Sequence, residues 1–476
     1  MLNSIYLQYT GEFICNYILN RMQHIFKITN SYTLMKFKLI FLKSFRLLIS
    51  LALIIISTNN IFAQDNKSAG QDEVSTTVTP HDKNAIFSAN ASYTFSVKNT
   101  YSNIQSGRIS YIITDQFNKK LLTDSIHVNL ATKSTKDFDF IVPALKAGFY
   151  KINFMINVSD YDDTIRRVFG IRADEIRSTH EKPDDFNQFW DESKKELSSI
   201  KPDFKITEQP ELEKLNQKVY IIEMKSIGNM TIRGWMTMPA SRKKNQKLPV
   251  LLMLPGYQAA TKPLIGHNED MCFISADVRG QGLNKETMLM RNEDYITYHL
   301  EDKNKYYLRG VIMDCLRYMD FICSRPELDM SRISVGGGSM GGYMALATAA
   351  LDKRVSFCAA QNPIMSDVYN LDNGAVAWPI NYMKKYVAIW PGLTFNKVLA
   401  NLQYFDTKNF APLISCPVFL GIGLLDPYVP PNNSYVVYNN INSKKKIMVF
   451  KDLGHEVGKK YDNYETLWMR DDFALF

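Results

Sequence analysis

One serine in this sequence sits among glycines in a pattern that suits nucleophilic catalysis. Residues 337–341 read Gly-Gly-Ser-Met-Gly, which fits G-x-S-x-G with Ser339 at the centre. The run "ISV" before the motif predicts a strand, and "YMALATAA" after it predicts a helix. A serine on such a strained strand–turn–helix presents its hydroxyl to a substrate carbonyl. We therefore expect Ser339 to be a nucleophile; the alternative is a glycine-rich turn with a solvent-facing serine.

A serine hydroxyl needs a general base at neutral pH, and the sequence offers one in the right order. The chain has seven histidines, and only His455 follows Ser339, in "VFKDLGHEVG", a predicted strand and turn. For a nucleophile on this kind of turn the chain order is serine, acid, histidine. We therefore predict that His455 takes the serine proton.

The acid that orients this histidine must come from the end of a strand between the two residues. Asp426 ends the apolar run "PVFLGIGLLD" and is followed by proline, so we favour it, with Glu456 as a rival. Its role would be to fix the imidazole tautomer and to stabilise the imidazolium. The other aspartates considered for this role are Asp352, Asp367, Asp372, Asp406 and Asp452.

The oxyanion of an acyl-transfer reaction needs two backbone N–H donors. One is expected from the residue after the nucleophile, Met340, and the other from the loop after an earlier strand. The stretch "LLMLPGYQAA" reads as that strand and loop, which makes Tyr257 the expected second donor.

These residues need a sheet to position them, and residues 181–476 predict one. Short apolar runs that end in Gly, Asp, Asn or Pro alternate with helical stretches such as "RGVIMDCLRYMDFICSRPE". This alternation predicts an α/β fold, a mostly parallel sheet with helices on both faces. Functional loops in such sheets lie at the carboxyl ends of the strands.

The region before the sheet has a different pattern. Within residues 76–175, apolar side chains fall at every second position, as in "SYTFSVKN" and "YKINFMINVSD", between polar turns. This pattern predicts an antiparallel β-sandwich of the immunoglobulin-like type. The sandwich carries no catalytic constellation, so it would be a packing or spacer module, with carbohydrate binding as the alternative.

The basic charge of the chain is concentrated in its leader. Residues 1–64 carry six Lys or Arg and one acid, a net +5, which leaves +3 of the total +8 for the rest. Residues 35–63 read as a signal peptide, with a basic flank, a short apolar core and a cleavage site near Ala63. The alternative is an N-terminal membrane anchor, but the apolar run is shorter than the roughly 20 residues that a span needs. We expect residues 1–34 to lie upstream of the true start at Met35, and residues 64–75 to form a linker. The sequence thus predicts a secreted or periplasmic protein with no stable membrane span after cleavage and no nucleic-acid partner.

The six cysteines give no metal or disulfide signature. No CxxC or CxxH pattern occurs, so no metal site is predicted. The cysteines after the leader stand in apolar surroundings and read as small buried hydrophobic residues.

Several motifs resemble one known family. The stretches "DVRGQG" (277–282), "GGSMGG" around Ser339 and "GHE" (454–456) resemble the signatures of the acetyl xylan esterase/cephalosporin C deacetylase family, carbohydrate esterase family 7. The stretches "PDDFNQFW", "IRGWMTMP" and "NFAPLISCPVFLGIGLLDPYVPP" agree as well. The resemblance runs from about residue 181 to the C-terminus and leaves out residues 76–175.

The resemblance implies an α/β-hydrolase fold, no cofactor, and removal of acetyl groups from acetylated oligo- or polysaccharides. It assigns Ser339, Asp426 and His455 to a catalytic triad, and the N–H groups of Tyr257 and Met340 to an oxyanion hole. Arg279 and Gln281 would be structural organisers near the site.

The sequence departs from the family pattern at two places. Met340 stands where the family has Gln, a change that keeps the backbone N–H and loses a side-chain contact. The stretch 283–304 is shorter than in the family, where it helps to build oligomers and the mouth of the site. A homo-oligomer is therefore allowed but not specified, and the exact substrate stays open.

Two rival functions stay open from the sequence. The same fold could support a broader carboxylesterase or a peptidase, or the protein could bind glycans with a decayed esterase domain. Trp378 and Trp390 fall where a lid could lie, so each could stack on a sugar ring or belong to the core.

Overall fold

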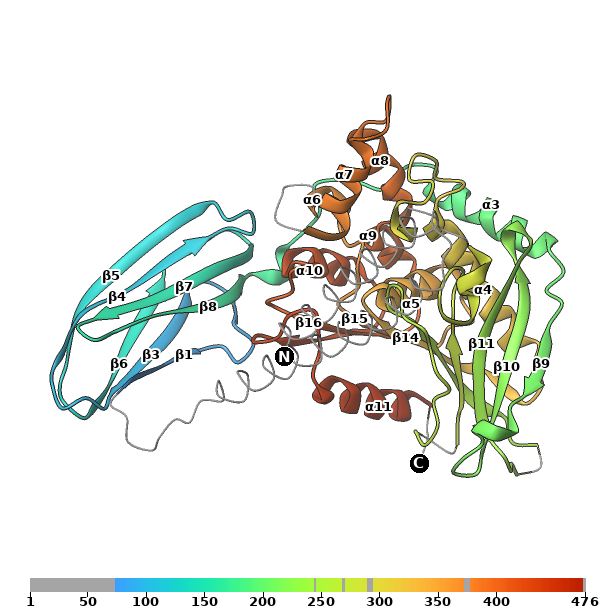
Figure 1. Ribbon diagram of the computed structural model, residues 1–476, viewed down its shortest axis with the longest axis horizontal. Helices are drawn as coiled ribbons and strands as arrows, with labels where there is room; N and C mark the ends of the chain where they lie inside the picture. The colour runs from blue at the N-terminus through green and yellow to red at the C-terminus, as the bar shows by residue number, and fades with distance from the viewer. Residues whose placement is uncertain (1–72, 244, 268–269, 289–293, 372–376, 474–476) are drawn as a thin grey trace, which may run out of the picture. The chain divides into compact units, whose positions relative to one another are not determined.

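The fold is taken from a computed structural model that describes residues 73–243, 245–267, 270–288, 294–371 and 377–473 (Figure 1). All of these residues belong to one compact unit. The predicted segments 1–34 and 35–63, and most of the predicted linker 64–75, lie outside the described residues. No helix among the described residues is long and apolar enough to cross a membrane.

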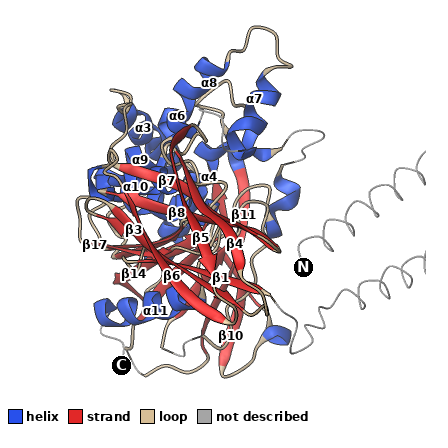
Figure 2. Cartoon of the chain, turned by 90° about the vertical axis from the view of Figure 1, so that its left-hand side faces the viewer, coloured by secondary structure: helices blue, strands red, loops and turns tan. Residues whose placement is uncertain are grey.

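The first part of the described chain forms two sheets, as the alternating pattern predicts. From residue 73 to residue 172 this region contains strands and turns but no helix (Figure 2). One sheet has the order β1-β3-β6 and the other the order β2-β8-β7-β4-β5. Neighbouring strands are antiparallel except β2 and β8, which are parallel. The strands are β1 Val74–Pro80, β2 Ile86–Phe87, β3 Ala91–Asn99, β4 Gln105–Thr114, β5 Lys120–Leu130, β6 Ser134–Val142, β7 Gly148–Val158 and β8 Tyr161–Ile171.

Aromatic rings fill the space inside these strands. Tyr93 and Phe95 of β3, Phe140 of β6, and Phe154 of β7 are all buried, and their ring centroids lie 5.2–6.4 Å from one another where they touch. Edge-to-face packing at such distances is favourable beyond the burial of apolar area. The alternating pattern therefore places these rings in the buried core.

The rest of the chain is built on a nine-stranded mixed sheet with the order β17-β16-β15-β14-β12-β13-β11-β10-β9. The strands from β12 to β17 are parallel, and β9, β10 and β11 add an antiparallel edge. The strands are β9 Lys205–Glu208, β10 Gln217–Ser226, β11 Met230–Pro239, β12 Leu248–Leu254, β13 Cys272–Ala276, β14 Leu328–Gly338, β15 Phe357–Gln361, β16 Val418–Gly423 and β17 Lys445–Phe450.

Helices cover both faces of this sheet (Figure 1). The helix α11 packs Tyr461 and Met469 against Phe357 and Phe419 on one face, while α4, α5 and α10 belong to the larger core on the other. The helices are α3 Phe186–Ser199, α4 Tyr307–Cys323, α5 Met340–Leu351, α6 Val368–Leu371, α7 Tyr382–Val387, α8 Phe395–Leu402, α9 Thr407–Phe410, α10 Pro431–Asn440 and α11 Lys459–Phe473. Short helical turns lie at Ala173–Glu175, Pro210–Leu212, Ile227–Asn229, Gly282–Thr287, Tyr295–Thr297, Ala377–Asn381, Gln403–Phe405 and Ala411–Leu413.

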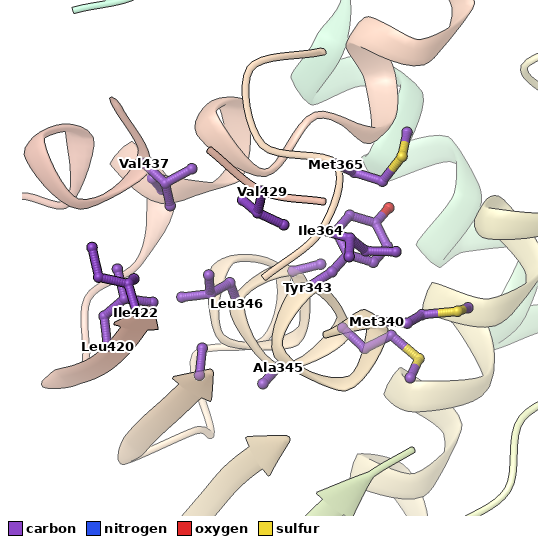
Figure 3. Close-up of a cluster of buried hydrophobic side chains, with 14 of the residues drawn as sticks. Met340, Tyr343, Ala345, Leu346, Ile364, Met365, Leu420, Ile422, Val429 and Val437 are labelled. Carbon is purple, nitrogen blue, oxygen red and sulfur yellow. The ribbon is translucent and has the colours of Figure 1, made fainter. Parts of the chain in front are cut away.

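The helix α5 is the most deeply buried element next to the sheet. Nearly all of its residues are buried, including the small residues of the run "ALATAA". Figure 3 shows Leu346 of α5 beside Leu420 and Ile422 of β16, with Tyr343 near Ile364. A helix that is apolar all round has no face for water, so it is fixed from every side.

The turn between β14 and α5 depends on two glycines. A Cβ at Gly337 would lie 2.6 Å from the carbonyl oxygen of Leu254, and a Cβ at Gly341 would lie 2.2 Å from the same oxygen. A Cβ at Gly338 would meet nothing closer than 3.6 Å, which is ordinary contact. The end of β12, the end of β14 and the start of α5 therefore approach so closely that only hydrogen atoms fit between them.

A buried charged cluster holds the segment that enters α6. The Nζ of Lys408 lies 3.1 Å from Asp367 Oδ1 and 3.9 Å from Asp406 Oδ2, and all three side chains are buried. The Asp406 carboxylate also accepts the N–H groups of Asp367 and Val368, each at 2.8 Å. Lys408 donates to Ser178 Oγ at 2.7 Å, so the cluster ties the chain before α3 to α6 and α9.

We predict that Gly337→Ala and Gly341→Ala strongly destabilise the protein, whereas Gly338→Ala does not. The first two place a methyl group against backbone that cannot move aside, at a cost of several kcal/mol typical of strained core substitutions. Thermal unfolding of the three variants would check this. Equal melting temperatures for all three would contradict the close approach described above.

We predict that Lys408→Met weakens folding by about 3 kcal/mol or more, because it leaves two carboxylates buried without a cation. Burial raises the pKa of Asp406 to about 6, above its value in an unfolded chain, and loss of the ammonium raises it further. A carboxyl group whose pKa is raised in the folded state destabilises the protein as pH rises, because its charged form is disfavoured there. The difference in free energy of unfolding between wild type and Lys408→Met should therefore grow between pH 5 and pH 8.

The measurement is chemical denaturation of Lys408→Met at several pH values, beside Lys385→Met. Lys385 is exposed on α7, so its variant controls for loss of a positive charge alone. A deficit that is independent of pH would show that the cluster does not depend on its ionisation.

Candidate active site

Ser339 occupies the turn between β14 and α5, in a backbone conformation that residues other than glycine rarely adopt. Its φ is 58° and its ψ is −118°, and it caps the N-terminus of α5. Its N–H donates to the carbonyl oxygen of Gln361 at 2.8 Å, and its own carbonyl accepts the N–H of Tyr343 at 3.1 Å. Strain of this kind persists only where the surroundings fix it. The close approach at Gly337 and Gly341 supplies that fixation.

His455 contacts Ser339, and Asp426 contacts His455, from loops that follow neighbouring strands. Ser339 Oγ and His455 Nε2 are 2.8 Å apart, and His455 Nδ1 and Asp426 Oδ2 are 2.7 Å apart. His455 follows β17 and Asp426 follows β16, so both loops lie at the carboxyl ends of parallel strands. The structure thus brings the three sequence-predicted residues into one hydrogen-bonded chain.

The Asp426 carboxylate is held from both of its oxygens. Oδ1 accepts the N–H groups of Tyr428 at 2.8 Å and Val429 at 2.9 Å, while Oδ2 faces His455. Its side chain is fully buried, whereas that of His455 is 20% exposed. A carboxylate fixed in this way orients the imidazole with Nδ1–H toward itself and leaves Nε2 to accept the serine proton.

The other candidate acids lie in different environments. Asp367 and Asp406 belong to the buried cluster with Lys408, and Asp352 forms an ion pair with Arg354. Asp452 pairs with Lys451, and Glu456 is exposed with no hydrogen bond or ion pair in the described part of the chain. Asp372 lies outside the described residues.

The expected oxyanion donors lie on either side of the Ser339 turn. Met340 begins α5, where the first N–H groups of a helix lack an intrahelical acceptor. Tyr257 follows β12, and the carbonyl of Leu254 at the end of that strand is the atom closest to Gly341. Within the described residues, no acceptor engages the backbone N–H of either Tyr257 or Met340.

The Met340 side chain points away from this turn. It is fully buried and packs in the apolar core beside α5 (Figure 3). The departure from Gln at this position therefore adds apolar contact inside the core.

Three aromatic residues border the site, and we call them the aromatic wall: Tyr257, Trp378 and Tyr428. The ring of Tyr428 lies 4.9 Å from that of His455, and Trp378 lies 6.3 Å from Tyr428 and 5.0 Å from Tyr257. The hydroxyl of Tyr257 accepts the N–H of Ile296 at 3.0 Å, which fixes the loop after β12. Trp390 lies elsewhere, exposed in the turn after α7, where its ring contacts Tyr386.

Arg279 and Gln281 do not touch the catalytic-triad candidates; they fix the turn after β13. Arg279 is buried and donates to both oxygens of Asp314 on α4, at 2.9 and 2.7 Å. Gln281 donates to the hydroxyl of Tyr307, which in turn donates to the carbonyl of Arg279 at 3.1 Å. The turn after β13 is therefore fastened to α4.

Sequence reasoning missed two features that bear on the site. The charged cluster of Lys408 joins residues more than two hundred positions apart, and no local pattern signals it. The sandwich also contacts the start of α10, the helix after the loop that carries Asp426, since Asn432 accepts the N–H of Phe149 at 3.0 Å and donates to Gln116. Among the described residues, no group of three His, Cys, Asp or Glu side chains could hold a metal ion.

Comparison with known proteins identifies the family of the chain. The family model "Acetyl xylan esterase (AXE1)" matches residues 172–472. The chain is 31% identical to the acetyl esterase Axe7A of Xylanibacter ruminicola over 347 residues, which cover 68% of this chain and 74% of that protein.

Solved structures give the same result for the fold. An acetyl xylan esterase from Paenibacillus sp. R4 is 26% identical with a TM-score of 0.58, covering 63% of this chain and 98% of its own. Acetyl xylan esterase 1 from Thermoanaerobacterium sp. JW/SL YS485 is also 26% identical, with a TM-score of 0.57 and the same coverage. These matches confirm the predicted α/β-hydrolase fold. The chain belongs to the acetyl xylan esterase family and is a carboxylic-ester hydrolase.

Proposed function

We propose that this protein removes acetyl groups from acetylated sugars through an acyl-enzyme formed on Ser339. The observation that carries the proposal is the hydrogen-bonded chain Ser339–His455–Asp426, with contacts of 2.8 and 2.7 Å. The acetyl esterase and acetyl xylan esterases to which the chain is similar support the acyl group and the substrate class.

The proposed reaction uses each residue at a stated atom. Ser339 Oγ attacks the acetyl carbonyl carbon while His455 Nε2 takes the hydroxyl proton, and Asp426 stabilises the imidazolium through Nδ1–H. The N–H groups of Tyr257 and Met340 stabilise the oxyanion; each such donor is worth about 3 kcal/mol in the transition state. His455 then protonates the departing sugar oxygen, and the acetyl-enzyme forms. Water attacks this intermediate with His455 as base, releasing acetate and restoring the serine.

A small acyl group suits the surroundings of the site. The aromatic wall stands between the loop of Tyr257 and the ring of His455, with Trp378 contacting both of its neighbours. We infer that these large rings limit the room for a long acyl chain beside the reacting carbonyl. This favours acetyl esters over the rival assignment of a broad carboxylesterase or peptidase.

The second rival, a glycan-binding protein with a decayed esterase domain, is disfavoured by the same contacts. A chain that no longer hydrolyses esters has no need to keep a buried carboxylate, an imidazole and a strained serine aligned. Secretion or export to the periplasm, and cleavage near Ala63, stay predictions from the sequence, as does any homo-oligomer.

We predict that Ser339→Ala lowers kcat on an aryl acetate by at least about 10⁴-fold and that Asp426→Asn has a comparable effect through the wrong histidine tautomer. Glu456→Gln is the matched control, because this exposed acid neighbours His455 and was the rival orienting group. Retained activity in Ser339→Ala would overturn the mechanism, and a large loss in Glu456→Gln would transfer the role to Glu456.

We also predict that kcat/KM on aryl esters falls steeply from acetyl to butanoyl in the wild type, and that Trp378→Ala flattens this profile. Removing the indole opens space next to Tyr257, so a longer chain gains more than acetyl does. Steady-state kinetics on a series of acyl chain lengths would measure it. A flat wild-type profile would favour the broad carboxylesterase instead.

A further inference from the structure

A cavity of about 310 Å³ lies between the sandwich and the loop that carries Asp426, which we call the acid loop (residues 424–430). Its walls on the sandwich side include Gln116, Lys151, Arg166 and Arg167, and on the other side Leu425 and Pro427 of the acid loop. The sandwich side thus carries three cationic side chains beside the apolar Phe149 and Val168, and the opposite side is mostly apolar.

The register of β7 and β8 explains why polar groups face the cavity. Lys151 is paired with Val168 and Asn153 with Arg166, so these four side chains share the outer face of the sheet. Ile152 and Phe154, between them in sequence, are buried in the sandwich core. Lys151, Asn153 and Arg166 therefore share one face of the sheet with the apolar Val168, whereas Arg167, paired with Ile152, follows the other face.

Each charged group in the cavity other than Arg166 has a partner. Lys151 donates to Asn118 Oδ1 at 2.7 Å; burial lowers the pKa of its ammonium, and the nearby Asp115 opposes this shift. Arg167 Nε lies 3.7 Å from Asp452 Oδ1, and Asp452 also contacts Lys451.

Arg166 remains without a partner. Among the described residues, no hydrogen bond or ion pair engages its guanidinium, which is exposed at the cavity. Asp426 also lines the cavity, but its oxygens face His455 and backbone N–H groups and form no hydrogen bond or ion pair with Arg166 among the described residues. The cavity therefore offers one free guanidinium beside a lysine.

The acid loop connects this cavity to the catalytic residues. Leu424, Leu425, Asp426 and Pro427 line the cavity, while the next residue, Tyr428, packs its ring on His455. One short loop therefore contacts both the cavity and the ring of His455.

We propose that Arg166, assisted by Lys151, binds the carboxylate of a uronate residue carried by the substrate. Guanidinium and carboxylate match in shape and form paired charge-assisted hydrogen bonds. The inference rests on the proposed function and narrows it: the preferred substrates are acetylated saccharides that also bear uronic acid. The sandwich would then be part of the substrate site.

The test compares acetylated xylo-oligosaccharides that bear a glucuronate side chain with the same oligosaccharides after reduction of the carboxyl group to an alcohol. Acetylated oligogalacturonides form a third arm, since a uronate can also come from a backbone. Acetate release gives kcat and KM for wild type, Arg166→Gln, Arg166→Lys and the control Arg108→Gln, an exposed arginine on β4 outside the cavity.

We expect the wild type to prefer the glucuronate substrate over its reduced form by about tenfold in kcat/KM, mainly through KM. Arg166→Gln should abolish this ratio, Arg166→Lys should restore part of it, and Arg108→Gln should keep it. Preference for oligogalacturonides instead would assign the carboxylate to a backbone uronate.

Two results would overturn the inference. One is equal kcat/KM for the charged and reduced substrates in the wild type. The other is a ratio of these two kcat/KM values in Arg166→Gln that equals the wild-type ratio. Either can occur while the reduced, neutral substrate is still deacetylated, so the proposed function would stand. Failure of the proposed function would appear separately, as no acetate release from any substrate.

Discussion

The close approach of three backbone segments around Ser339 is the constraint on which the site depends. The carbonyl of Leu254 at the end of β12 faces Gly341 at the start of α5 and Gly337 at the end of β14, with no side chain between them. This contact fixes the strained serine and brings the loop of Tyr257 beside the first turn of α5. Gly337 and Gly341 are thus points of close packing, because a glycine has no Cβ to separate the backbone segments.

Much of the fold could be predicted because the signals are local. Period-two alternation predicts the strands of the sandwich, and apolar runs that end in turn residues predict the parallel strands of the mixed sheet. The α/β-hydrolase fold and the family follow from the comparisons as expected. The pairing of Ser339 with His455 was accessible for a simpler reason: no other histidine follows the serine in the chain.

Other features could not be predicted because they depend on residues far apart in the chain. Several aspartates were candidates for the acid, and only the tertiary structure shows that Asp426 faces His455 while Asp406 faces Lys408. The sequence could not say where the Met340 side chain points, since the same position provides both a backbone donor and a side chain. The contact of Phe149 with Asn432 joins two regions that no sequence pattern relates.

That contact has a thermodynamic consequence. The ring of Phe149 lies 5.1 Å from that of Tyr435, and Asn432 holds the backbone of β7, so the sandwich packs directly on α10. Unfolding the sandwich would expose these rings and release the start of α10, which follows the acid loop. We therefore expect the sandwich and the acid loop to unfold together. Contacts made by the sandwich, which carries no catalytic residue, thus help to hold Asp426 in place.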